Sequence, residues 1–314
     1  MRIARSALVL VLVGTVLAAC SKGGTSGGGG TGCGAGHLNF NKQFPPTQTF
    51  GATKDATVAA EVPASIRSKG SITVAIDAEY APNEAIQGGK IVGWDVALGQ
   101  AIAAVMGLKF DGTNVIFDNI IPGIQSGKYD LGLSSFTDTK EREKVVDFVT
   151  YFKAGSSFVV CAHGGTHVTS LEQLCGKTAA VQTSTTQQAD ATSQSKKCTA
   201  AGKPAVKVLP FEKQTDANLA LASGRAQVMM ADTPIAAYQV SLSGGTLASH
   251  SFKLAGAYGV APYGIAVPKN SGLLKPVQDA VNKLISDGIY MKILTEWGEQ
   301  SGAVSSATTN GAIF

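Results

Sequence analysis

Charged residues are scarce in this chain of 314 residues, where Asp, Glu, Lys and Arg together make up 15% and the formal net charge is +4. So small an excess, without a basic stripe that carries interleaved aromatic residues, argues against nucleic acid as a partner. No C-x-x-C pair is present, and no histidine lies near the one segment rich in hydroxyl groups. Nothing in the sequence therefore supports nucleophilic catalysis, and we expect neither a catalytic residue nor a cofactor.

Long apolar runs are also missing, apart from one near the N-terminus. Residues 7–18 are free of charge and follow Arg2 and Arg5, which is the pattern of a secretory signal and is too short to span a membrane. The run ends in Leu-Ala-Ala-Cys at Cys20, which resembles a bacterial lipobox; the alternative is an ordinary signal peptide. We expect a signal at residues 1–19, a lipid on Cys20, and a chain held at the outer face of the cell membrane.

A glycine-rich segment follows the signal. Nine of the sixteen residues from 21 to 36 are glycine, a composition that cannot bury apolar surface. No strand precedes these glycines and no Gly-Lys-Ser/Thr completes them, so they do not form a phosphate-binding loop. We expect residues 20–61 to be a flexible tether. The net charge falls to +2 once Arg2 and Arg5 leave with the signal.

Cysteines are few, and an exported chain lives where disulfides persist. With Cys20 assigned to lipid, Cys175 and Cys198 are favoured as a pair that closes a loop of 24 residues. Cys161 is either free and buried or paired with Cys33. Cys161 also stands close to His163 and His167, but a closed metal site needs four converging ligands. Because two glycines separate the histidines, we expect no metal there.

Strands and helices alternate through the remainder of the chain, which indicates an α/β sheet protein. Strands are expected at 70–77, at the start and end of 114–135, and at 177–182, 205–211 and 226–232. Helices are expected at 93–108, 185–197, 216–225, 273–287 and 288–298. The order repeats, so we expect two α/β lobes: residues 62–154 and 264–314 form the first, and residues 155–263 form the second. Two hinge strands would join the lobes, with a ligand between them.

Six segments carry a family resemblance: "AIDAEYAPNE", "GKIVGWDVALGQAIA", "FDNIIPGIQSGKYDLGLSSFTDTKEREKVVDFVTYF", "SLEQLCGKTAAVQTSTTQ", "SGRAQVMMAD" and "DGIYMKILTEWG". In this order and spacing the chain resembles the family 3 extracellular solute-binding proteins, the receptors of polar amino-acid ABC importers, over about residues 62–300. The resemblance implies the bilobed periplasmic-binding-protein type II fold. It also implies a ligand that is a free amino acid.

The resemblance assigns the ligand's α-carboxylate to a loop with hydroxyl groups and an arginine. Here these residues are Ser135, Thr137 and Arg142, and Ser134 is expected beside them as a further ligand-binding residue. A guanidinium grips a carboxylate with two parallel hydrogen bonds, and hydroxyls fill the remaining lone pairs. The alternative is that Arg142 pairs with Glu141 or Glu143 on a solvated helix face.

The second lobe is expected to complete the zwitterion site. The resemblance gives Thr185 and Thr186 to the carboxylate, although Ser184 stands where the family commonly has glycine. It gives Asp232 to the α-ammonium; the alternative is a helix N-cap ahead of Thr233-Pro234.

The side-chain end of the pocket is less specific in sequence. The resemblance aligns Asp77 and Tyr80 with an acid and an aromatic of the first lobe, and Phe117 would cover the ligand's apolar stem. Asn83, where many members have phenylalanine, would make the pocket more polar. Glu84 would add negative charge or anchor its loop.

These assignments together imply a monomeric, lipid-anchored receptor. It would close on a polar or cationic amino acid and deliver it to an ABC permease with its ATPase. A dehydratase-like enzyme of the same fold and a solute sensor are the alternatives. The Arg142 and Asp232 motifs favour an intact amino acid over the keto acid of a dehydratase.

Overall fold

The structure is a computed structural model that describes Cys33, residues 43–243 and residues 252–314. The expected signal peptide and Cys20 lie outside the described residues.

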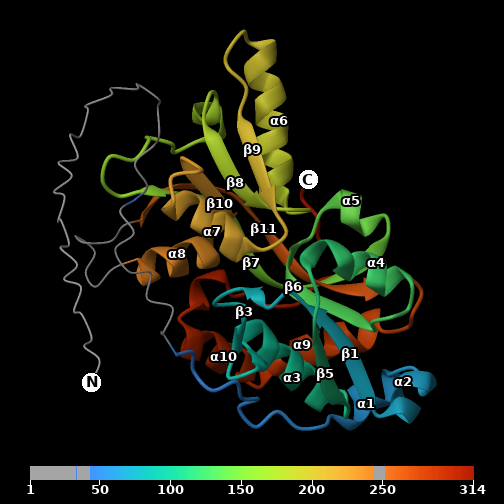
Figure 1. Ribbon diagram of the computed structural model, residues 1–314. Helices are drawn as coiled ribbons and strands as arrows, with labels where there is room; N and C mark the ends of the chain where they lie inside the picture. The colour runs from blue at the N-terminus through green and yellow to red at the C-terminus, as the bar shows by residue number, and fades with distance from the viewer. Residues whose placement is uncertain (1–32, 34–42, 244–251) are drawn as a thin grey trace, which may run out of the picture.

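One large mixed sheet runs through both lobes (Figure 1). Its strand order is β5-β1-β6-β11-β7-β10-β8-β9. The strands are β1 (Ser71–Ile76), β5 (Lys109–Asn114), β6 (Leu131–Thr137), β7 (Val146–Cys161), β8 (Thr178–Gln182), β9 (Lys207–Phe211), β10 (Val228–Asp232) and β11 (Phe252–Pro268). Strand β1 is parallel to β5 and β6, and β8 is parallel to β9 and β10, so each lobe has its own parallel unit.

Strands β7 and β11 connect the two units. They are antiparallel partners of 16 and 17 residues, much longer than the other strands. Their register shifts between Tyr258 and Ala261, where the pair passes from one lobe to the other, and such irregularities bend a sheet locally. The expected lobe boundaries at 154/155 and 263/264 fall inside these two strands.

The helices flank the sheet on both faces (Figure 1). They are α1 (Ala56–Glu61), α2 (Ala64–Lys69), α3 (Trp94–Val105), α4 (Ile120–Gln125), α5 (Lys140–Glu143), α6 (Thr186–Ala200), α7 (Gln214–Ala222), α8 (Thr233–Leu242), α9 (Leu274–Ser286) and α10 (Ile289–Trp297), with 3-10 turns η1 (Phe117–Asn119), η2 (Leu171–Leu174) and η3 (Gln300–Gly302).

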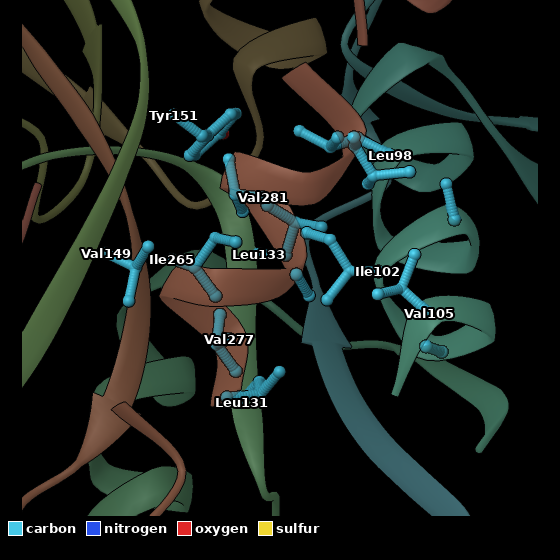
Figure 2. Packing of buried hydrophobic residues seen from close by; sticks show 14 of the residues in the cluster. Leu98, Ile102, Val105, Leu131, Leu133, Val149, Tyr151, Ile265, Val277 and Val281 are labelled. Carbon is cyan, nitrogen blue, oxygen red and sulfur yellow. The ribbon is translucent and has the colours of Figure 1, made fainter. Parts of the chain in front are cut away.

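Each lobe has a separate apolar core. In the first lobe, Leu98 and Ile102 of α3 pack against Val277 and Val281 of α9, over the side chains of the central strands (Figure 2). The opposite face of that sheet is covered by α4. In the second lobe, α7 and α8 pack on one face and α6 on the other. In the described residues, strands β7 and β11 run from one core to the other, an arrangement that permits the lobes to move as bodies.

The sequence pattern predicted most of these elements, and all expected strands except one are confirmed. The strand expected at the start of 114–135 is wrong, because β5 ends at Asn114 and the chain turns into η1. A second sheet was not expected: β2 (Glu79–Tyr80), β3 (Glu84–Gln87) and β4 (Lys90–Val92) form three short antiparallel strands.

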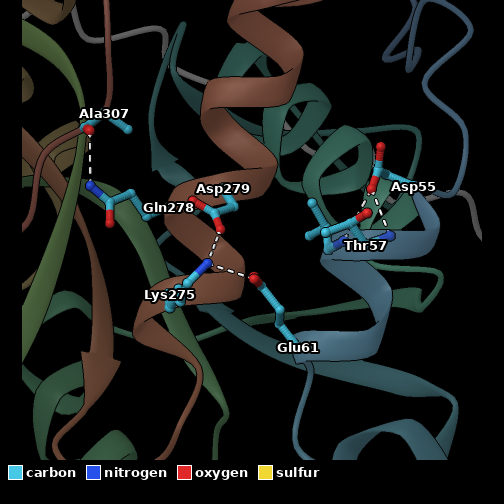
Figure 3. A network of polar contacts seen from close by, with 8 residues as sticks. Asp55, Thr57, Glu61, Lys275, Gln278, Asp279 and Ala307 are labelled. Carbon is cyan, nitrogen blue, oxygen red and sulfur yellow. Dashed lines mark hydrogen bonds and ion pairs between the residues drawn. The ribbon is translucent and has the colours of Figure 1, made fainter.

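The expected tether is too long at its C-terminal end. Helix α1 lies inside the range 20–61 and is capped by Asp55, whose carboxylate accepts the N–H groups of Thr57 and Val58. Val58 is buried against the first-lobe core. Glu61 pairs with Lys275 of α9 at 2.5 Å (Figure 3). The segment from residue 43 to 61 is therefore part of the folded body.

Two disulfides are present. Cys175–Cys198 confirms the favoured pair, and Cys33–Cys161 selects one of the two alternatives for Cys161. Cys33 belonged to the expected tether, so this bond fixes a point of that segment to the second lobe.

Loss of the Cys175–Cys198 bond should lower the free energy of unfolding by about 3 kcal/mol, because the open chain gains loop entropy when it unfolds. The double variant Cys175→Ser with Cys198→Ala leaves Cys33–Cys161 as an internal reference. Urea denaturation of the oxidised proteins measures the difference. An unchanged midpoint in the double variant would show that the bond does not restrain the unfolded chain.

Candidate functional site

A small cavity, of about 10 Å³, lies between the lobes where strands β6, β8 and β10 end. Ligands of open α/β sheets bind at such carboxyl ends. The lining residues are Tyr80, Phe117, Ser134, Ser135, Thr137, Arg142, Gln182, Thr185, Thr186, Gln187 and Asp232.

Nine of the eleven residues expected at the ligand line this cavity. Asp77 and Glu84 do not line it, whereas Gln182 and Gln187 do and were missed. Gln187 follows Thr186 in the first turn of α6, and a helix that begins at a site presents this position to it. That signal was available in the sequence.

The hydroxyl groups of β6 are held by acids behind them. Ser134 Oγ donates to Glu84 Oε1 at 2.9 Å and accepts the backbone N–H of Asp77 at 3.0 Å. Ser135 has a left-handed φ of 51°, and its backbone N–H donates to Asp95 Oδ2 at 3.1 Å. These bonds fix the loop, so both residues are positioned before any ligand arrives.

Glu84 and Asp95 form a buried acidic pair in this inner layer. Both are fully buried, and burial raises the pKa of each, that of Asp95 to about 6. The charge of Asp95 raises the pKa of Glu84 further. Two carboxyl groups so placed cannot both ionise easily, so the pair retains a proton near neutral pH. Of the two roles considered for Glu84, the loop anchor is the one that its hydrogen bonds describe.

Asn83 does not make the cavity more polar, contrary to the expectation. It is fully buried behind the loop. Its Nδ2 donates to Ser135 Oγ at 2.8 Å, and its Oδ1 accepts Trp94 Nε1–H at 2.8 Å. The side chain therefore supports Ser135 and is not presented to a ligand.

Arg142 reaches from the first lobe to the second. One terminal nitrogen donates to the Thr137 carbonyl oxygen at 2.7 Å and the other to the Ser184 carbonyl oxygen at 2.8 Å. The guanidinium carbon lies 5.5 Å from the centre of the Phe117 ring and 5.3 Å from that of Phe136. Burial lowers its pKa to about 10, so it remains charged at neutral pH.

No carboxylate of the described residues forms an ion pair with this guanidinium. Glu141 pairs with Lys144, and Glu143 Oε1 accepts the Ala312 backbone N–H at 3.0 Å. The alternative in which Arg142 is neutralised by its own helix is therefore excluded by the geometry. A buried cation with N–H groups to spare is suited to an anion.

The second-lobe loop holds Ser184, which stands where the family commonly has glycine, in a backbone conformation that glycine adopts easily. Ser184 has a φ of 60°, in the left-handed region that favours glycine. Thr185 is the N-cap of α6, and its Oγ1 accepts the Gln188 backbone N–H at 3.2 Å. The serine therefore preserves the turn, and the positive end of the helix dipole is directed toward the cavity.

Asp232 stands at the N-cap position of α8 but makes no capping hydrogen bond with its side chain. Instead, its Oδ2 accepts Tyr80 O–H at 2.9 Å from the other lobe, and its Oδ1 accepts Gln187 Nε2–H at 2.7 Å. Burial raises the pKa of Asp232. The alternative in which the Asp232 side chain caps α8 is therefore wrong, because this carboxylate is hydrogen-bonded at the cavity instead.

Asp77 lies one layer away from the cavity, behind Gln182. Gln182 Nε2 donates to Asp77 Oδ2 at 2.5 Å and to the Glu212 carbonyl oxygen at 3.0 Å. Burial raises the pKa of Asp77 to about 7, and the charge of Glu79 adds to the rise. Asp77 is thus connected to the cavity through a second-lobe amide.

Further bonds cross between the lobes around the cavity. Thr183 Oγ1 donates to Asp118 Oδ1 at 3.0 Å. Glu79 accepts Lys213 Nζ at 3.0 Å and Thr215 Oγ1 at 3.1 Å. With the Tyr80–Asp232 and Arg142–Ser184 contacts, these bonds hold the lobes in a closed arrangement.

In the described part of the chain, no three His, Cys, Asp or Glu side chains come together as metal ligands would. Cys161 is consumed by its disulfide. Among the described helices, none combines the length and apolar character that crossing a bilayer requires.

The free energy of unfolding should fall as pH rises from about 4 toward 7. The folded state raises the pKa of Asp77 from 3.8 to about 7, so it binds a proton that the unfolded chain has lost. This contribution of Asp77 to the free energy of unfolding is complete below the unfolded-state pKa of 3.8. It disappears as the pH rises past the folded-state pKa of about 7.

Asp77→Asn should reduce that fall, whereas the exposed-site control Asp111→Asn should retain it. Thermal unfolding of the three proteins across the pH range measures the difference. If Asp77→Asn kept the wild-type slope, the protonation of Asp77 in the folded state would be refuted.

Comparison with known proteins identifies the family. The model of the bacterial extracellular solute-binding proteins, family 3, matches residues 72–300. The arginine-binding protein ArgT of Corynebacterium glutamicum is 32% identical over 255 residues, which cover 81% of this chain and 82% of the relative.

Solved structures agree with this. An ancestral arginine-binding protein bound to arginine is 36% identical with a TM-score of 0.66, covering 73% of this chain and 98% of the other. An ancestral arginine-binding protein bound to glutamine is 37% identical with a TM-score of 0.65, and the match covers 73% of this chain and 98% of the other. The chain belongs to the bacterial extracellular solute-binding proteins, family 3, and is an exported binding protein rather than an enzyme.

Proposed function

We propose that the chain binds a free L-amino acid with a long cationic side chain, arginine before others, between its lobes. It then delivers the amino acid to the membrane subunits of an ABC importer. The observation that carries this proposal is one cavity lined both by the half-buried Arg142, which forms no ion pair with a carboxylate of the described residues, and by the buried carboxylate of Asp232.

Arg142 is the proposed partner of the ligand's α-carboxylate. Thr137, Thr185 and Thr186 line the cavity beside it, and the N-terminus of α6 adds favourable potential for an anion. The carboxylate would replace the Ser184 carbonyl oxygen as acceptor for one guanidinium nitrogen. Its second oxygen would accept an N–H of another guanidinium nitrogen, so that the two groups form a bidentate pair.

Asp232 is the proposed partner of the α-ammonium group. Tyr80 and Gln187 hold its carboxylate from two sides, and each oxygen keeps a lone pair for a further donor. An ammonium group there would favour the ionised form of Asp232, which offsets the cost of its burial.

The ligand's side chain would meet an acidic environment on the first-lobe side. Asp77 and Asp118 lie behind or beside the lining residues, while Arg142 is the only cationic side chain that lines the cavity among the described residues. This balance opposes an acidic ligand and favours a guanidinium or ammonium. Phe117 would pack on the aliphatic stem.

Relatives support the same choice of ligand. Several similar proteins are named for arginine, one relative is named for glutamine, and one ancestral protein is solved with glutamine. Glutamine is the second candidate, because Gln182 already shows that an amide N–H can approach Asp77.

We further propose that Cys20 carries the lipid anchor and that the protein acts as a monomer. The lobes would close about the β7–β11 crossing, near the boundaries 154/155 and 263/264.

Isothermal titration of the full chain against the twenty amino acids should give heat with arginine and weaker heat with glutamine. Arg142→Ala should raise the arginine Kd by about thirtyfold or more, since removing one partner of a buried charge pair costs about 2 kcal/mol. Arg142→Lys should recover only part of that loss, because lysine lacks the fork.

Arg225→Ala, an exposed arginine of the second lobe, is the matched control and should leave the Kd unchanged. The absence of binding heat with all twenty amino acids would refute the assignment of an amino acid as ligand. Equal binding by wild type and Arg142→Ala would refute the role of Arg142.

A further inference from the structure

The chain continues beyond residue 300, where the family match ends, and returns to the element that carries Arg142. Its end lies beside α5 (Figure 1). We call residues 303–314 the tail.

The first part of the tail is fixed to the first lobe. The Ala307 backbone N–H donates to Asn282 Oδ1 at 2.8 Å, and its carbonyl oxygen accepts Gln278 Nε2–H at 3.1 Å (Figure 3). The Thr150 N–H donates to the Thr308 carbonyl oxygen at 2.8 Å, and a bridge joins Thr309 to Val149. The tail thus pairs with the edge of β7 that β11 leaves free in this lobe.

The last part of the tail forms hydrogen bonds with residues that precede and follow Arg142 in the sequence. The Gly311 N–H donates to Asp138 Oδ2 at 2.7 Å, and the Ala312 N–H donates to Glu143 Oε1 at 3.0 Å. The Lys140 N–H donates to the Phe314 carbonyl oxygen at 2.9 Å. Helix α5 has only four residues, too few to be stable without external contacts.

These bonds also decide where the neighbouring carboxylates point. Asp138 is fully buried and Glu143 lies one residue after Arg142. Either carboxylate, if released from its tail N–H, would be free to pair with the guanidinium and neutralise it. The tail therefore has two effects: it orders α5, and it engages the two acids that compete with a ligand for Arg142.

We propose that the backbone N–H groups of Gly311 and Ala312 position Arg142 for the ligand's carboxylate and keep its guanidinium free of Asp138 and Glu143. This inference rests on the proposed function, in which Arg142 binds that carboxylate. Residues 311–314 are not among the residues that line the cavity, so their proposed effect on the ligand passes through Arg142.

The test compares the full chain with a chain shortened after Asn310. A matched control shortened after Ala312 removes Ile313 and Phe314 but retains both donor N–H groups. Titration with arginine should show a Kd raised about tenfold in the chain that ends at Asn310, the scale of one charge-assisted hydrogen bond. The control should lose much less.

A double-mutant cycle separates positioning from general destabilisation. Combined with Arg142→Ala, the shortening after Asn310 should cause no further loss of affinity. Glu143→Gln in the shortened chain should recover part of the affinity, because a neutral amide no longer competes for the guanidinium. An equal loss with and without Arg142, or a shortened chain with the wild-type Kd, would overturn the proposal.

Hydrogen exchange of the ligand-free protein supplies a readout that does not depend on the ligand's identity. The backbone of residues 138–145 should exchange faster in the chain ending at Asn310 than in the full chain. Unchanged exchange there would overturn the proposed hold on α5. If the full chain bound no amino acid, the proposed function would fail, and exchange alone would decide whether the tail orders α5.

Discussion

The rest of the site depends on one constraint: the Arg142 guanidinium lies half-buried between two lobes, and no carboxylate of the described residues forms an ion pair with it. A buried cation is costly unless an anion and well-placed acceptors surround it. Here two carbonyl oxygens and two aromatic rings supply part of that environment. An anion held between the same lobes would supply the rest, so binding and lobe closure would be driven by the same interaction.

The acids of the site are arranged around this cation in two layers. Asp232 lies at the cavity, held by Tyr80 from the other lobe, whereas Glu84 and Asp95 lie deeper and fix the backbone of the hydroxyl loop. Charge separation of this kind matches a zwitterion along the cavity.

The sequence predicted several regular elements of each lobe and the short motifs whose chemistry is local. Alternation and helical spacing predicted β8, α6 and β10, and the hydroxyl loop with Arg142 predicted the centre of the cavity. Prediction failed where contacts between segments distant in sequence decide the direction of a side chain or the order of a segment. Which way Asp77 and Glu84 face depends on the three short strands β2–β4, and Asn83 was misplaced for the same reason. Helix α1 and the tail gain their order from α9 and β7, partners far away in sequence.

The most direct test of the central claim is a crystal structure of the protein with L-arginine. Both carboxylate oxygens of the ligand should lie on the Arg142 guanidinium and its α-ammonium on Asp232, with its side chain directed toward Gln182 and Asp77. A ligand bound in the reverse sense, or an Arg142 that keeps its bond to the Ser184 carbonyl oxygen with no carboxylate beside it, would contradict the account.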